Sequence, residues 1–118
     1  MAGERERQSG DSELIVRLAD LEIDPAQLHR YKALLAEEIK ASVKMEQGVL
    51  MLHAVSVKGS PAQIRIFEVY ADQEAYEAHL ASPHFLKYKT STSNMVRSLR
   101  LLETDPIMLC AKDGLSEI

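Results

Sequence analysis

The sequence predicts an α+β fold in which one antiparallel sheet is built from two strand–helix–strand halves. Two observations support this prediction. First, segments rich in branched apolar residues and segments with apolar residues at helical spacing follow one another in the order β-α-β-β-α-β. Second, Asp24-Pro25 and Ser82-Pro83 each place a capping side chain directly before a proline, which is typical of a helix start. This order is that of the split βαβ, or ferredoxin-like, arrangement.

The first half contains one strand and one long helix. The segment "ELIVRLADLEI" predicts a strand from about Leu14 to Leu21. The helix is expected to begin at Asp24-Pro25 and to run to about Lys44, and Gly48 then suits the turn. Its buried stripe is expected to hold Leu28, Tyr31, Leu35 and Ile39, widened by Leu34 and Val43. The residues expected mostly off this stripe are Glu37, Glu38 and Lys40.

The second half is a hairpin followed by a broken helix and a final strand segment. "VLMLHAVSV" and "QIRIFEVY" predict the two hairpin strands, and "KGSPA" between them predicts the loop. Asp72 caps a helix to about Ala81, and the chain restarts as a helix at Ser82-Pro83. One face of that helix is expected to carry Phe85, Tyr88, Thr92, Met95, Val96 and Leu99. "LRLLETDPIMLCA" then supplies a last strand or two, interrupted at Asp105-Pro106.

Length and composition describe one globular domain: 118 residues, 46% hydrophobic and 27% charged. We expect this domain at 13–112, between a flexible N-terminal tail at 1–12 and a C-terminal tail at 113–118. A formal charge of −4 without a Lys/Arg cluster argues against a nucleic-acid partner, and no apolar run is long enough to cross a membrane. The single cysteine, Cys110, favours a cytoplasmic protein with a buried, unreactive thiol.

Both faces of the predicted sheet are apolar. In the strand "VLMLHAVSV", one face is expected to carry Leu50, Leu52 and Ala54, and the other Val49, Met51, Val55 and Val57. The helices suffice for one face only. Covering ~500 Å² of apolar sheet contributes on the order of 12 kcal/mol before association costs. We therefore predict a homodimer packed sheet to sheet; the alternative is a monomer whose N-terminal tail folds over the sheet.

The stretch "EQGVLMLHAVSV…RIFEVYADQEAYEAHLASPHFLKY" resembles the antibiotic biosynthesis monooxygenase family. The resemblance spans about Leu14 to Ala111. Its most specific parts are the glutamate in "FEVY", the spacing from it to "EAYEAH", and "SPHF". It implies a homodimeric α+β barrel with a pocket between sheet and helices in each subunit. It also implies oxidation of phenolic, quinol or polyketide-like small molecules by dioxygen without metal, flavin or haem.

Two branches of this family imply other chemistry. One isomerises a small phosphorylated diketone, for which Arg17 or Arg65 could supply the positive charge. The other degrades haem, and the sequence argues against it. The chain contains no Trp, Tyr70 occupies the corresponding position in the strand, and Lys89 stands where the axial histidine is expected.

Glu68 is the first candidate for chemistry, because a carboxylate on an apolar sheet face is costly to bury unless it is paired or protonated. It either bonds to a histidine on a helix and orders the core, or it serves as a proton acceptor or as the orienter of a histidine. His79 is expected near the buried face of its helix, as a packing residue or as a pocket base. His84 lies in the first turn after Pro83, where a helix N-terminus favours neutral imidazole; it is expected either to accept a proton or polarise a carbonyl, or to face solvent.

Aromatic residues could line the substrate pocket or pack the core; they are Tyr31, Tyr70, Tyr76, Phe85 and Tyr88. His53 is expected to point toward the partner sheet, and His29 to be solvated. No metal site is expected, because the histidines lack HxH or HExxH spacing and there is no second cysteine.

Three functions remain open at this point. The first is a cofactor-independent oxygenase in which His79 or His84 is the base and Glu68 orients it. The second is an isomerase or tautomerase of a small carbonyl compound. The third is a dimeric module that binds a small ligand without reaction.

Overall fold

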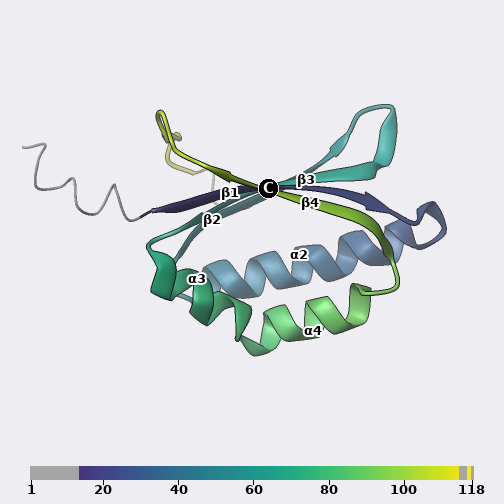
Figure 1. Cartoon of the computed structure of the whole chain (residues 1–118), viewed down its shortest axis with the longest axis horizontal. Helices are drawn as coiled ribbons and strands as arrows, with labels where there is room; N and C mark the ends of the chain where they lie inside the picture. The colour runs from purple at the N-terminus through teal and green to yellow at the C-terminus, as the bar shows by residue number, and fades with distance from the viewer. Residues whose placement is uncertain (1–13, 115–116, 118) are drawn as a thin grey trace, which may run out of the picture.

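The computed structural model describes residues 14–114 and 117 and shows a four-stranded antiparallel sheet with its helices on one face (Figure 1). The strand order is β2-β3-β1-β4. The elements are β1 (Ile15–Ile23), the 3₁₀ turn η1 (Pro25–Gln27), α2 (Leu28–Met45), β2 (Val49–Val57), β3 (Ser60–Tyr70), α3 (Gln73–Leu80), α4 (Pro83–Thr92) and β4 (Val96–Thr104). This arrangement confirms the α+β, ferredoxin-like prediction. The predicted tail at 1–12 lies outside the described residues.

The predicted caps do begin the helical segments. The Asp24 carboxylate accepts a hydrogen bond from the Ala26 backbone N–H at 3.0 Å, although the first turn is 3₁₀ rather than α-helical. Asp72 accepts from the Ala75 N–H at 2.8 Å and opens α3. The Ser82 hydroxyl caps α4, as described below for the site. Within the described residues, no helix has the length and apolarity that a bilayer span requires.

The β2–β3 hairpin is tighter than predicted. β3 begins at Ser60 rather than at Gln63, where "QIRIFEVY" begins, so the connection is the two-residue turn Lys58–Gly59. Gly59 has φ +85°, a left-handed conformation that glycine adopts without steric cost. Of the predicted loop "KGSPA", only Lys58 and Gly59 therefore form a turn, and the other three residues belong to β3.

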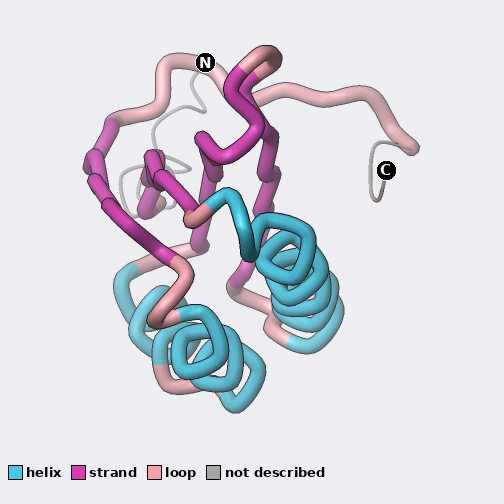
Figure 2. The backbone as a smooth tube through the Cα atoms, turned by 90° about the vertical axis from the view of Figure 1, so that its right-hand side faces the viewer, coloured by secondary structure: helices cyan, strands magenta, loops and turns pink. Residues whose placement is uncertain are grey.

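The C-terminal half of the broken helix is shorter than predicted. α4 ends at Thr92, and the Met95 N–H bonds to the Thr92 carbonyl at 2.8 Å in a turn. Val96 and Leu99 therefore belong to β4, because pairing with β1 along its whole length outweighs their helical spacing. β4 is the only strand after that turn in the described residues. Residues 105–114 extend away from the sheet (Figure 2), and the thiol of Cys110 is exposed rather than buried.

A bulge in β2 changes which side chains share a face. Two residues of β2 oppose one residue of β3 at Leu50, so the alternation restarts after it. Leu50 is 51% exposed, whereas Val49 and Leu52 on either side of it are buried. The prediction that Leu50 shares a face with Leu52 and Ala54 is therefore wrong.

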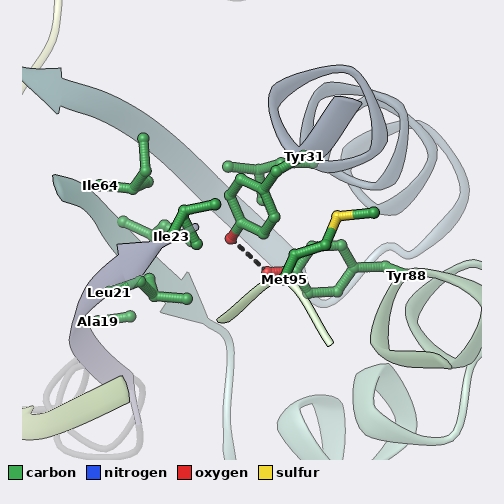
Figure 3. Close-up of a cluster of buried hydrophobic side chains, with 9 residues drawn as sticks. Ala19, Leu21, Ile23, Tyr31, Ile64, Tyr88 and Met95 are labelled. Atoms are coloured by element: carbon green, nitrogen blue, oxygen red, sulfur yellow. Dashed lines mark hydrogen bonds between the residues drawn. The ribbon is translucent and has the colours of Figure 1, made fainter. Parts of the chain in front are cut away.

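The larger buried cluster between sheet and helices includes two tyrosines (Figure 3). Tyr31 of α2 and Tyr88 of α4 point at each other, and their hydroxyl oxygens lie 2.6 Å apart. Ile23 of β1 and Met95, the residue before β4, belong to the same buried cluster. The expected stripe of α2 needs one correction: Ser42 is buried and Val43 is 45% exposed.

Candidate active site

A cavity of about 580 Å³ lies between the helix-facing side of the sheet and helices α2, α3 and α4. Most of its wall is apolar, with Leu35 and Ile39 from α2 and Leu52 and Ile66 from the sheet. This volume falls in the range of pockets that hold small organic molecules. One group of polar residues lies where α3 and the C-terminal half of α2 face the sheet, and a second group comes from α4 and β4, including Lys89 and Arg97.

Glu68 and Arg17 lie side by side on the sheet floor of this cavity. They are direct partners in the β1–β3 ladder, and both line the cavity. The Tyr70 hydroxyl, two residues along the same strand, donates a hydrogen bond to Glu68 Oε1 at 2.8 Å. Strand alternation places all three on the helix-facing side.

The environment of Glu68 favours its protonated form. Burial raises the pKa of its carboxyl group, and this outweighs the lowering effects of the Tyr70 hydrogen bond and the nearby Arg17 charge. A carboxylate with a raised pKa is a stronger base than a free one. It is therefore suited to taking a proton from a weakly acidic substrate.

Arg17 is buried but only partly satisfied. It donates through Nη1 to the Tyr76 hydroxyl, and its Cζ lies 4.6 Å from the centroid of the Tyr76 ring. Its Nε is 3.0 Å from Glu103 Oε2, yet this N–H is not aligned for a hydrogen bond to any group in the described residues. The guanidinium thus brings a positive charge to the cavity wall, where it would stabilise an anionic oxygen.

Glu38 of α2 faces the floor from the helix side. It is 6% exposed, and its Oε2 accepts a 2.8 Å hydrogen bond from the Ser42 hydroxyl. Burial is the main reason that its pKa is raised. The expectation that Glu38 lies off the buried stripe is therefore wrong: Tyr31, Leu35, Glu38 and Ser42 form the buried face of the helix.

Glu46, the residue after α2, links the two histidines. Its Oε2 lies 3.0 Å from His79 Nδ1 and 2.5 Å from His84 Nε2. Burial tends to raise the pKa of Glu46, but the hydrogen bonds from His84 and His79 outweigh it and leave the pKa lowered. Glu46 is therefore an ionised acceptor between two imidazole rings.

The two histidines occupy different positions. His79 is 2% exposed and lines the cavity, with its Nε2 3.5 Å from Glu38 Oε2. His84 lines a separate groove of about 410 Å³ on the other side of Glu46. Glu46 also lines that groove, which is called the outer groove below. Of the two histidines, His79 is thus the one at the cavity.

The capped junction between α3 and α4 fixes this arrangement. The Ser82 hydroxyl donates to the His79 carbonyl at 2.8 Å and accepts from the Phe85 N–H at 3.3 Å. On the other side, α3 approaches the start of β2 closely. A Cβ on Gly48 would lie 2.4 Å from the Ala75 Cβ. Only glycine lets Glu46 and His79 approach this closely across the junction.

The predicted site residues are largely brought together. Tyr70, Tyr76 and Phe85 line the cavity with Glu68 and His79. Tyr31 is not on the cavity wall, because its hydroxyl turns to Tyr88 in the packed core.

The expected pairing of Glu68 with a histidine is not observed, and the two remaining histidines are exposed. Glu68 bonds to neither histidine, because its hydrogen-bond partner is Tyr70 and the histidines bond to Glu46. His53 is exposed, and its neighbour Ala54 packs toward the helices, so His53 lies on the opposite face. His29 is exposed on α2.

Sequence reasoning missed Glu46 and Glu38. Glu38 could have been found, since it is seven residues after Tyr31 and so falls on the same helical face. Glu46 carried no such signal, because its role depends on a turn that brings distant segments together. Because the histidines show no metal-binding spacing in the sequence, the sequence did not reveal that Glu46, His79 and His84 converge in space.

The fold and cavity define a class: small ferredoxin-like α+β domains that enclose a pocket between sheet and helices. The sequence profile of the antibiotic biosynthesis monooxygenases matches residues 14–91. The chain belongs to this family, which confirms the resemblance. No curated protein matches the chain.

Solved structures agree with this assignment. The chain is 45% identical to a protein from Bacteroides thetaiotaomicron VPI-5482 that is provisionally named an antibiotic biosynthesis monooxygenase, with a TM-score of 0.84 over 87% of this chain and 98% of that one. A protein from Lactobacillus acidophilus NCFM, provisionally named a monooxygenase, is 27% identical, with a TM-score of 0.74 over 75% of this chain and 42% of that one. A Caulobacter crescentus CB15 protein at 15% identity shares the fold, with a TM-score of 0.77 over 89% of this chain and 100% of that one. Family and neighbours together support a monooxygenase-like function.

Proposed function

We propose that the chain oxidises a small phenolic, quinol or polyketide-like molecule with dioxygen, without a cofactor, and that Glu68 is the proton acceptor. The observation that carries this proposal is a buried carboxylate with a raised pKa on the floor of a largely apolar cavity, beside a buried guanidinium. The substrate itself supplies the electrons. Family membership supports the reaction class.

Each polar group at the floor has a role in this proposal. Glu68 accepts the phenolic or enolic proton. Arg17 stabilises the resulting oxyanion through the positive charge of its guanidinium, and Tyr70 orients Glu68 through its hydrogen bond. The apolar wall excludes water from the electron-rich anion.

The reaction balances with dioxygen alone. In an anthrone-type substrate, whose enol is the tautomer of a CH₂ ketone, the anion left by loss of the enolic proton reacts at that carbon with O₂ to give a peroxide. Loss of water from that peroxide leaves a carbonyl where a CH₂ stood. One oxygen atom enters the substrate, the other leaves as water, and both hydrogens of the CH₂ leave in that water. The substrate carbon is oxidised and O₂ is reduced, so no external reductant is required.

Glu68 replaces the histidines as the favoured base. His84 lines the outer groove instead of the cavity, and the ionised Glu46 holds the Nδ1 hydrogen of His79. His79 can still contact a substrate through the face of its ring, while its Nε2 faces Glu38. Phe85 and Tyr76 would then contact the substrate ring from the helix side.

Oxygen consumption with a panel of quinols and anthrone-type phenols tests the proposal. We expect turnover that depends on O₂ and a yield of one oxidised product per O₂ consumed. Glu68→Gln should lose turnover, while Tyr31→Phe, in the packed core, should keep it. Product formation under anaerobic conditions would rule out the oxygenase.

The isomerase remains the second candidate because of one observation. Arg17 at the floor and the cationic Lys89 and Arg97 on the wall all face the same cavity. An anionic or phosphorylated carbonyl compound would suit that charge, and Glu68 would move a proton between carbons. Turnover of such a compound without O₂ uptake would favour this function.

The homodimer is part of the proposed function. The sheet face opposite the helices carries no helix (Figures 1 and 2), and it exposes Val55 (61%) and Leu102 (36%). Packing two such faces would complete the α+β barrel that we propose for a cytoplasmic dimer. Sedimentation equilibrium should give the mass of a dimer at micromolar concentration, and Val55→Lys with Leu102→Lys should shift it to a monomer. A wild-type monomer would contradict the proposal.

A further inference from the structure

We propose that Glu46, His79 and His84 form a binding site for one divalent transition-metal ion of the zinc class. Glu46 Oε2, His79 Nδ1 and His84 Nε2 all lie within 4.8 Å of one another. They come from the ends of three different helices, so their convergence is a property of the tertiary fold.

The ligand chemistry fits this class of ion. Two imidazole nitrogens and one carboxylate oxygen are ligands that zinc prefers, and an open fourth position takes water. Metal–ligand distances near 2.1 Å in a tetrahedron place ligand atoms ~3.3 Å apart. The observed separations from Glu46 Oε2 are 3.0 Å and 2.5 Å. The Glu46 oxygen therefore has to move away from each imidazole nitrogen by less than about 1 Å, as the ion replaces the two hydrogens that now link them.

The ligands are held in place before any ion arrives. His79 ends α3, and Ser82 ties its carbonyl to the first turn of α4, which carries His84. Gly48 lets α3 approach the residue that follows α2. A site whose ligands are fixed by packing loses little conformational entropy when it binds an ion.

Glu38 provides a second, independent observation. The other ring nitrogen of His79, Nε2, lies 3.5 Å from Glu38 Oε2, and both groups are almost fully buried. Ser42 holds that carboxylate in turn. Histidines that bind metal usually direct their free N–H at such a carboxylate, which fixes the ring and strengthens the ligand. Nothing in the proposed oxidation requires this arrangement behind His79.

The geometry places the ion on the side of the outer groove. Glu46 and His84 line that groove, and the ring of His79 stands between their atoms and the cavity. The outer groove gives the ion a path from solvent and leaves room for a water ligand. The ion would thus join three helix ends without touching a substrate in the cavity.

Titration of the chelator-treated full chain with Zn²⁺, followed by calorimetry and thermal unfolding, tests this site. We expect one equivalent to bind and the midpoint of unfolding to rise with Zn²⁺ concentration. Glu46→Gln and His84→Ala should each abolish that equivalent. The matched controls are His53→Ala and His29→Ala, which remove exposed histidines elsewhere and should leave the stoichiometry at one. Binding that survives both ligand substitutions, or no binding at all, would overturn the proposal.

Two further measurements separate a built site from loss of folding. Co²⁺ should give the visible absorption of a four-coordinate site in the wild type and none in His84→Ala. Glu38→Gln leaves all three ligands in place and should weaken Zn²⁺ binding by about 10- to 100-fold. Unchanged affinity in Glu38→Gln would contradict the role of that carboxylate. Oxygen uptake by the chelator-treated chain is expected to persist, so a failure of either proposal can be recognised separately.

Discussion

The two halves of helix α2 bury very different side chains against the same sheet. Near its N-terminus, Tyr31 packs with Tyr88 and Ile23 in a buried cluster of apolar and aromatic side chains. Near its C-terminus, Glu38 and then Glu46 are drawn toward His79. Burial of apolar side chains by the N-terminal half of α2 stabilises the fold. The second half opposes stability through the desolvated carboxyl group of Glu38, and such groups are expected to persist where they serve a function.

The largest expected effect is that of Glu68→Gln, which changes the carboxylate on β3 that shares the cavity with Glu38 of the C-terminal half of α2. Removing the proton acceptor should lower turnover by about 10²- to 10⁴-fold. The free energy of unfolding should stay the same or rise, because a neutral amide is easier to bury than a carboxylate. Steady-state oxygen uptake and urea unfolding of the same preparation measure both quantities. A loss of turnover matched by a loss of folded protein would remove Glu68 from the mechanism.

Ile23→Ala should show the reverse pattern. Ile23 is fully buried beside Tyr31, so the truncation should destabilise the fold by about 2–5 kcal/mol. Turnover per folded molecule should change little, because Ile23 does not line the cavity. Chemical denaturation gives the first quantity and activity at low temperature gives the second. Strong loss of activity in fully folded protein would show that the two halves are not separable.

Gly48→Ala tests the junction that supports the polar half. The new Cβ meets Ala75, and relieving that overlap should cost about 1–3 kcal/mol. The double variant Gly48→Ala with Ala75→Gly restores the space and should recover most of this loss. A thermodynamic cycle of unfolding free energies measures the coupling. Additive effects would mean that close packing at this point is not what positions α3.

The smallest expected effect is a pH dependence of stability that originates at Glu68. Its folded-state pKa is raised, so the stabilisation from its protonated form is complete below the unfolded pKa and is lost as pH rises through the folded pKa. One such group contributes a slope of at most about 1.4 kcal/mol per pH unit. The charged or titratable groups around it are Arg17 of β1, Tyr70 of β3, Glu38 of α2, His79 of α3 and Glu103 of β4.

Urea unfolding at a series of pH values tests this dependence. Between the two pKa values of Glu68, the wild type should lose stability as pH rises. Glu68→Gln should show a shallower decline over the same interval. Arg65→Gln, which alters an exposed charge paired with Asp20, serves as the control and should keep the wild-type slope. Equal slopes in wild type and Glu68→Gln would place the titrating group elsewhere.

The packed half could be predicted from sequence far better than the polar half. Strand order and helix starts follow from apolar patterning and from local signals such as Asp24-Pro25, which act within a few residues. The end of α4 was missed because pairing of β4 with β1 is a long-range interaction that overrides helical spacing. Glu68 stood out as a charge on an apolar strand.

The partners of the histidines could not be predicted in this way. His79 and Glu46 are 33 residues apart, and they meet only because α3 packs on the turn after α2. No local pattern in the chain encodes that distance. The same reason explains why Glu68 was expected to pair with a histidine and instead bonds to Tyr70.

The bulge at Leu50 separates two requirements that would otherwise compete. Upstream of it, the chain must hold Glu46 and Gly48 against α3; downstream, β2 must keep its side chains in phase with β3. An extra residue that loops out between these segments lets either one be adjusted alone. Insertion or deletion of a single residue there would be absorbed locally, so the reach of the helix end could change without exchanging the two faces of the whole strand.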